Sequence, residues 1–168
     1  MKKIAALVLM TLGSIMFLSA GRFEVGLSGG FFSSKSNSGA VLGIFPGFRI
    51  SNSVSIETGF LYYPSATNDY YSNQSLSEVG LYVLVGLIPY KENRTVVPYL
   101  AFGPAYFLWG DGSIEDIQMA VGGGLNKPMS KRVSLRIDFR YFFPLIPDNE
   151  YPAFKNLWRG TVGVSFRL

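Results

Sequence analysis

Charged residues that could act together recur at every second position of one stretch near the C-terminus. Arg136, Asp138 and Arg140 alternate there with apolar residues, so an extended strand puts all three on one face. Three acidic residues hold the same kind of position in earlier segments. The complete candidate set is Glu24, Glu57, Glu78, Arg136, Asp138 and Arg140. Such a set can form a path for protons or ions, or a structural network of buried ion pairs; we favour the network.

Catalytic chemistry has little support in the composition. The chain contains no His and no Cys, which removes the commonest general base and the thiolate ligands of metal sites. A Ser–Lys pair could act instead, and Ser33, Ser34 and Lys35 are close in sequence, but they lie in the polar run SSKSNS, which is typical of a solvated loop. Asp111 and Asp116 do not have the spacing of an EF-hand. We therefore expect no enzyme activity, no metal and no cofactor.

Binding to nucleic acid is also not expected. The formal net charge is only +4, and the basic residues form no cluster. The glycine run Gly122–Gly124 is not followed by a helical pattern, so it does not predict a phosphate-binding loop.

The first 20 residues have the organisation of a secretory signal peptide. Lys2 and Lys3 precede the apolar run Ile4–Ala20, which ends in Leu-Ser-Ala. We expect residues 1–20 to be a signal peptide and residues 21–168 to be one domain. The alternative is an uncleaved anchor in the inner membrane, although the run is short for a spanning helix.

The rest of the chain has a hydrophobic period of two, which predicts strands. We find eight segments, most of about ten residues, the length of a tilted membrane strand. They are Arg22–Phe32, Ala40–Ile50, Val54–Tyr63, Glu78–Tyr90, Val96–Trp109, Glu115–Asn126, Arg132–Pro144 and Trp158–Leu168. The fifth is apolar on both faces, so its register is ambiguous. Pro46 and Pro104 lie inside predicted strands, where each removes a ladder hydrogen bond.

The connections alternate between short and long, as in outer-membrane barrels with short periplasmic turns and longer outer loops. The short ones read SNS, KENRT and KPMSK, and the longest are Pro64–Ser77 and Leu145–Leu157. The first of these long loops contains the polar and aromatic residues Asn68, Asp69, Tyr70 and Tyr71. Tyr and Asn suit adaptable contact surfaces, so we regard these four as a candidate interaction loop.

The second face of the strands decides between a membrane barrel and a soluble one. It combines charged residues with many glycines, which have no evident purpose on a surface in water. Inside a narrow eight-stranded barrel, glycines leave room for large side chains. The apolar face ends in aromatic residues such as Tyr62, Tyr141 and Trp158, which suit membrane interfaces. The predicted fold is all-β, an eight-stranded antiparallel transmembrane up-and-down β-barrel.

Three stretches carry a resemblance to a known group. The C-terminal GTVGVSFRL, the hairpin VGGGLNKPMSKRVSLRIDFRYFFP and the segment VVPYLAFGPAYF resemble small outer-membrane barrels of the OmpX/OmpA-like or OmpW-like kind. The resemblance implies a place in the outer membrane of a Gram-negative-type bacterium. It implies outer-membrane lipids and the barrel-assembly machinery as partners, the latter through the C-terminal strand, and we expect a monomer. Catalytic members of the group use His, which this chain lacks.

Three functions fit these observations. The first is a structural or surface-interaction role through the outer loops. The second is a narrow conduit for small hydrophobic molecules. The third is a soluble periplasmic ligand-binding barrel, which requires an apolar interior and a charged exterior. We expect Leu135→Arg to hinder membrane insertion, and to do so most if the residue lies near the bilayer midplane.

Overall fold

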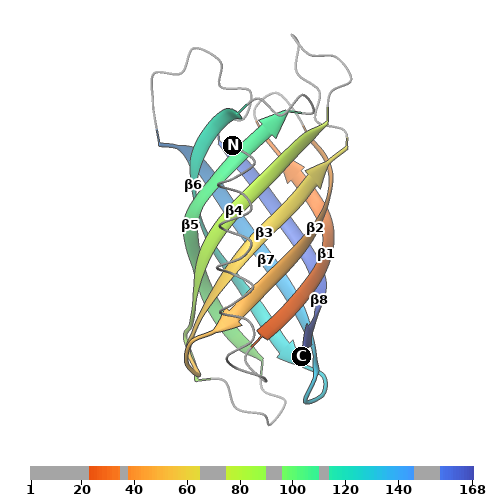
Figure 1. Cartoon of the computed structure of the whole chain (residues 1–168), viewed down its shortest axis with the longest axis vertical. Coiled ribbons are helices and arrows are strands. Elements are labelled where there is room, and N and C mark those ends of the chain that lie inside the picture. Colours follow the sequence, from red (N-terminus) through yellow and green to blue (C-terminus); the bar gives the residue numbers. More distant parts are fainter. Residues whose placement is uncertain (1–22, 35–37, 65–74, 90–95, 110–113, 146–155) are drawn as a thin grey trace, which may run out of the picture.

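The computed structural model describes residues 23–34, 38–64, 75–89, 96–109, 114–145 and 156–168. They form eight strands (Figure 1). The strands are β1 (Phe23–Ser33), β2 (Ser38–Arg49), β3 (Val54–Tyr63), β4 (Leu76–Gly86), β5 (Val97–Trp109), β6 (Ile114–Pro128), β7 (Val133–Pro144) and β8 (Leu157–Arg167). Among the described residues, no helix is long and apolar enough to cross a membrane.

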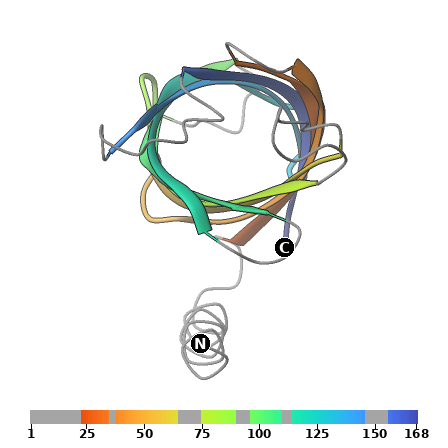
Figure 2. The same ribbon diagram turned by 90° about the horizontal axis from the view of Figure 1, so that it is seen from above.

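The strands close into a barrel. Each pairs antiparallel with the next, and β8 returns to pair with β1, from Glu24 opposite Arg167 to Ser33 opposite Trp158. Figure 2 shows the resulting ring from above. Because closure pairs the first strand with the last, no sheet edge is left to seek another partner. The predicted eight-stranded up-and-down barrel is confirmed.

Two tight turns at one end are built alike. The amides of Ile50 and Ser51 donate to the carbonyl of Val54, and those of Met129 and Ser130 donate to Val133. Ser51 Oγ accepts hydrogen bonds from the amides of residues 53 and 54, and Ser130 Oγ does the same two and three residues on. These serines complete the turns locally. The C-terminus lies at this end as well (Figure 1), which we call the short-turn end.

The predicted strand bounds are right to within two residues for seven of the eight strands. The exception is β4, predicted as Glu78–Tyr90 and observed as Leu76–Gly86. It begins earlier because Leu76 is fully buried and pairs with Trp109 in β5, despite the serines around it. It ends earlier because the chain turns after Gly86, whose amide donates to the carbonyl of Ser53.

Pro46 and Pro104 remain inside β2 and β5, and each interrupts one ladder. Pro46 lies opposite Val25 of β1, but the pairing of β2 with β3 skips from Ile44 to Gly47. Likewise Pro104 lies opposite Met119 of β6, while the pairing of β4 with β5 skips two residues. A missing amide hydrogen on one side of each strand accounts for both gaps.

Large apolar side chains cover the outer face, and the charged side chains in the middle of the strands point inward, among buried aromatic and aliphatic residues. Leu27, Phe31 and Phe139 are 51%, 75% and 52% exposed, whereas Arg140 and Arg159 are fully buried. The structure also shows which face of β5 points inward, because Ala101 and Phe107 are buried and Phe102 is exposed. This is the reverse of a soluble ligand-binding barrel, which the third functional alternative required.

Candidate functional site

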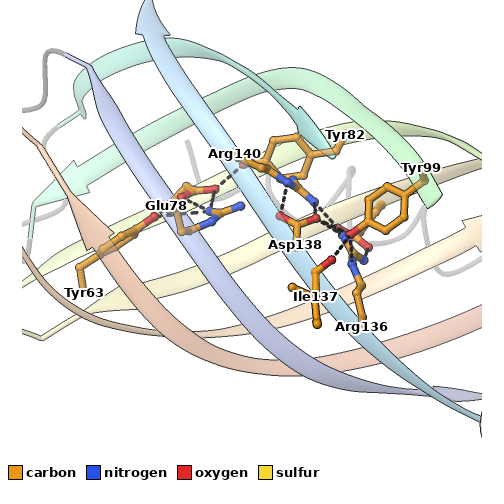
Figure 3. A network of polar contacts seen from close by, with 10 residues as sticks. Tyr63, Glu78, Tyr82, Tyr99, Arg136, Ile137, Asp138 and Arg140 are labelled. Carbon is orange, nitrogen blue, oxygen red and sulfur yellow. Dashed lines mark hydrogen bonds and ion pairs between the residues drawn. The ribbon is translucent and has the colours of Figure 1, made fainter. Parts of the chain in front are cut away.

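The interior of the barrel holds a layer of ion pairs between strands on opposite sides of the ring. Arg136 and Arg140 of β7 both pair with Glu57 of β3 and with Asp138 of their own strand. Figure 3 shows Arg136, Asp138 and Arg140 side by side along β7. Glu57 Oε1 lies 3.1 Å from Arg136 Nη2 and 3.0 Å from Arg140 Nη2. Asp138 accepts from Arg140 Nε at 2.8 Å and from Arg136 Nη2 at 2.8 Å. Alternation along β7 puts all three of its members on the inner face.

A second ion pair crosses the barrel from β8 to β4. Arg159 Nη1 lies 2.6 Å from Glu78 Oε1, and both side chains are fully buried. The hydroxyl groups of Tyr63 and Tyr82 donate to the two oxygens of the same carboxylate. Glu78 is therefore surrounded by one guanidinium and two phenols.

Tyrosines join these groups into one network. The Tyr82 ring lies 3.8 Å below the guanidinium of Arg140, a geometry in which cation and ring attract. Tyr99 donates to Asp138 Oδ2 at 2.6 Å and accepts from Arg136 Nε at 2.7 Å. The three cations of the layer, Arg136, Arg140 and Arg159, are balanced by Glu57, Glu78 and Asp138.

Glu24, predicted as part of the same set, lies apart from the others. It is the second residue of β1, at the short-turn end, and pairs with Arg49 at 2.5 Å and Arg167 at 3.3 Å. These partners come from the neighbouring strands β2 and β8, whereas Glu57 and Glu78 reach across the barrel. The side chain of Glu24 is 21% exposed, so it belongs to the barrel mouth.

The predicted charge network does not include Arg159 or the tyrosines, although strand alternation places their side chains on the same inner face. Arg159 lies directly opposite Arg140 in the β7–β8 pairing. Tyr63 shares the alternation of Glu57, and Tyr82 shares that of Glu78. Alternation from the glutamates therefore predicts both rings inside. The aromatic residues of the sequence by themselves indicate mainly the ends of the lipid face.

The glycines leave room mainly for rings rather than for the arginines. A Cβ at Gly80 would collide with the hydroxyl end of Tyr82, and one at Gly59 would lie 3.0 Å from the same ring. At Gly122 and Gly124, a Cβ would meet the carbonyl oxygens of Phe139 and Ile137 in β7. The glycines thus allow both ring packing and a close approach of backbones.

Aromatic rings pack above the ion pairs, away from the short-turn end. Phe32 and Tyr63 have ring centroids 5.0 Å apart, and those of Phe107 and Phe142 are 5.7 Å apart. Tyr63 and Phe107 join the pairs at 6.2 Å. All four side chains are at most 2% exposed. We call these four residues the aromatic layer.

A cavity with both polar and apolar groups in its wall lies on the other side of the ion pairs. It has a volume of ≈ 90 Å³ and extends from the turn Ser51–Ser53 to Glu57 and Arg136. Its wall includes Glu24 and Ser165. A cavity of this size has room for several water molecules, and the carboxylate, guanidinium and hydroxyl groups in its wall can bind them.

The other candidate residues fall outside this description. Asn68, Asp69, Tyr70 and Tyr71 lie outside the described residues, as do Lys35 and Asp111. The same holds for the side chain of Asp116. The interaction loop therefore stays a prediction.

Comparison with known proteins gives one family match. Residues 5–167 match the model of the outer membrane protein beta-barrel domain. No curated protein matches the chain.

Solved structures show the same fold at low sequence identity. The N-terminal β-barrel domain of Pseudomonas aeruginosa OprF matches with a TM-score of 0.63 and 12% identity, covering 87% of this chain and 98% of that one. Neisserial surface protein A matches at 0.58 and 20% identity, covering 89% and 98%. The outer membrane enzyme PagL matches at 0.55 and 9% identity, covering 86% and 99%. These matches show the architecture and carry no activity with them.

Proposed function

The chain belongs to the outer membrane protein beta-barrel family, and from that membership we propose that it acts through the surfaces it presents at the membrane. Its place is the outer membrane, with the short-turn end toward the periplasm. The proposed role is structural or surface interaction through the outer loops, without catalysis. Outer-membrane lipids surround the barrel as partners, and the barrel works as a monomer.

The observation that carries this proposal is the filled interior. Buried ion pairs join β3 to β7 and β4 to β8, and the aromatic layer packs above them. An eight-stranded barrel is only wide enough for side chains to fill. A solute would have to separate compensated charges and packed rings at the same time. The surfaces that remain for function are the outer loops.

Liposome swelling tests the filled interior. Vesicles containing the purified protein should be no more permeable to small sugars than protein-free vesicles. Vesicles with a larger porin serve as the positive control. Swelling by this protein at a comparable rate would contradict the proposal.

Exchange of the candidate loop tests the surface role. Asn68→Ser, Asp69→Ser, Tyr70→Gly and Tyr71→Gly together remove the aromatic and charged groups of the loop. We expect attachment of expressing cells to one another or to host-cell layers to fall, while the barrel still shifts on an unheated gel. Equal attachment by the variant and the unchanged protein would argue against this loop.

Absence of catalysis is a separate part of the proposal. The chain has no His, and the carboxylates of the interior are already occupied by guanidinium and phenol groups. Lipid extracts from cells with and without the protein should have the same mass spectrum. A protein-dependent change in lipid acylation would identify an enzyme.

One observation favours a second candidate, a conduit for small hydrophobic molecules. The ladder between β4 and β5 lacks two residue pairs beside Pro104, so fewer hydrogen bonds have to break there if the two strands part to form a lateral opening. Pro104→Val restores an amide donor at this position. If the conduit exists, deletion of the protein lowers uptake of small hydrophobic solutes, and Pro104→Val lowers it too. Uptake that is unchanged by deletion excludes the conduit.

A further inference from the structure

We propose that the short-turn end binds anionic phospholipid headgroups through Lys127, Lys131 and Arg132, which we call the basic corner. The proposal concerns the periplasmic leaflet and is independent of the role of the outer loops. Although the basic residues form no cluster large enough to predict nucleic-acid binding, these three lie together at the end of β6 and in the turn into β7, and all three are exposed. Within the described part of the chain, none of them pairs with a carboxylate.

Lys127 is the residue of the basic corner that lies on the lipid-facing side of the barrel. It follows Leu125 by two positions on the outward face of β6, and Leu125 is 46% exposed. Across the ladder it lies opposite Leu135 of β7, which also faces outward. A lysine in such a row lays its apolar stem along the lipid face and extends its ammonium group to the headgroups.

Apolar residues surround the cations at the same level. Met129, in the turn itself, is 56% exposed, and Leu168 is 71% exposed. The amide of Arg167 donates to the carbonyl of Arg132 at 2.8 Å, which holds the end of β8 against the turn. Exposed apolar side chains next to cations are the composition of a surface lying at a membrane interface.

The contrast with the interior shows why this surface attracts anions. Every arginine of the ion-pair layer has a carboxylate within 3.0 Å. Unlike these arginines, the three residues of the basic corner leave an uncompensated positive charge at headgroup depth. A basic residue near an anionic leaflet contributes about fivefold to the affinity. Phosphate groups of phosphatidylglycerol are the anions that a lipid-facing lysine can reach, whereas cell-wall carboxylates lie beyond the turn.

A fluorescent probe at the corner tests the proposal. Because the chain has no Cys, Met129→Cys can carry a single bimane label. The labelled protein is placed in vesicles of equal phosphatidylglycerol and phosphatidylethanolamine, with bromine on the chains of one lipid or the other. Stronger quenching by brominated phosphatidylglycerol reports its enrichment beside the corner. Phe31→Cys, 75% exposed near the opposite end of β1, is the matched control site.

We expect enrichment at position 129, none at position 31, and a decrease at high salt. Lys127→Gln, Lys131→Gln and Arg132→Gln together should lower the enrichment at least about fivefold, while Lys127→Arg with Lys131→Arg keeps it. An unheated gel verifies that each variant is folded. Equal quenching by the two lipids, or enrichment that survives the triple substitution, overturns the proposal. Unchanged lipid enrichment with loss of binding to cell-wall sacculi would assign the corner to the wall instead and also overturn it.

Discussion

Substitutions of the buried pair Glu78 and Arg159 should have strongly non-additive effects on the free energy of unfolding. Arg159→Met leaves a fully buried carboxylate with only its two phenol donors, so we expect unfolding to become easier by about 3–5 kcal/mol. Adding Glu78→Leu should recover much of this loss, because a buried pair replaced by apolar groups is often neutral. Urea titration of the barrel in lipid vesicles measures both effects.

Arg49 provides the matched control for that pair. Its guanidinium also meets a glutamate, Glu24, but both side chains remain partly exposed at the barrel mouth. Arg49→Met should therefore cost about 1 kcal/mol or less. Equal costs for Arg49→Met and Arg159→Met would show that burial does not determine the strength of these pairs.

Two glycines can show whether a larger residue destabilises the barrel by displacing a packed ring or at any strand position. A Cβ at Gly80 would collide with the Tyr82 ring, whereas one at Gly160 meets only Phe139 Cδ2 at 3.6 Å. We expect Gly80→Ala to destabilise the barrel by about 1–3 kcal/mol through overpacking. Gly160→Ala should be close to neutral or slightly stabilising. Thermal gel-shift midpoints of the two variants measure the difference, and a neutral Gly80→Ala would contradict the ring-packing explanation.

At the scale of the strands, the alternation of apolar and polar residues was enough to predict which side chains point into the barrel for most strands. It assigned the inner face correctly along β7, where Arg136 and Asp138 point inward, because period two leaves little choice once one face is apolar. It could not resolve β5, where Tyr99 and Leu100 are both large and apolar. Only the register with β6, which puts Tyr99 opposite Gly124, provides the space for the ring.

A single sequence could not predict which acidic residue pairs with which arginine inside the barrel. Whether Glu24 or Glu57 meets Arg136 depends on the relative heights of β1, β3 and β7, which the stagger of the closed barrel sets. No local pattern encodes that stagger. The ends of β4 were misplaced for a related reason, since the pairing of Leu76 with Trp109 is a property of two strands together.

Position along a strand determines what a charge on the lipid face costs. Ile137 lies near the middle of β7 and is 49% exposed, whereas Leu135 lies opposite Lys127 toward the short-turn end. We expect Ile137→Arg to hinder insertion by about 2–4 kcal/mol and Leu135→Arg by about 1 kcal/mol or less. The structure thus reduces the effect first expected for Leu135→Arg. Folding yields into vesicles measure the two variants, and equal yields would mean that Ile137 does not face the bilayer centre.

Along the axis, the whole molecule is asymmetric. The cavity occupies the short-turn end, the ion pairs cross the middle, and the aromatic layer fills the far side. Water can therefore hydrate Glu57 and Arg136 from the short-turn end without a path through the barrel. The desolvation cost of these charges is offset because each one is paired with an opposite charge, and further ion pairs and aromatic rings cover the pairs on the side away from the short-turn end.

Cysteine accessibility tests this asymmetry directly, because the chain has no native Cys to interfere. Ser165 lines the cavity at the short-turn end, while Ala105 is fully buried farther along the barrel, opposite Gly80 and two residues before Phe107. A small charged thiol reagent should label Ser165→Cys readily in the folded barrel and leave Ala105→Cys unlabelled until the protein is boiled. Labelling of Ala105→Cys at the rate of Ser165→Cys would mean that the ion pairs and rings open often enough to admit solutes. The conduit would then be the better account of the molecule, since a barrel that only presents its loops has no need for a moving interior.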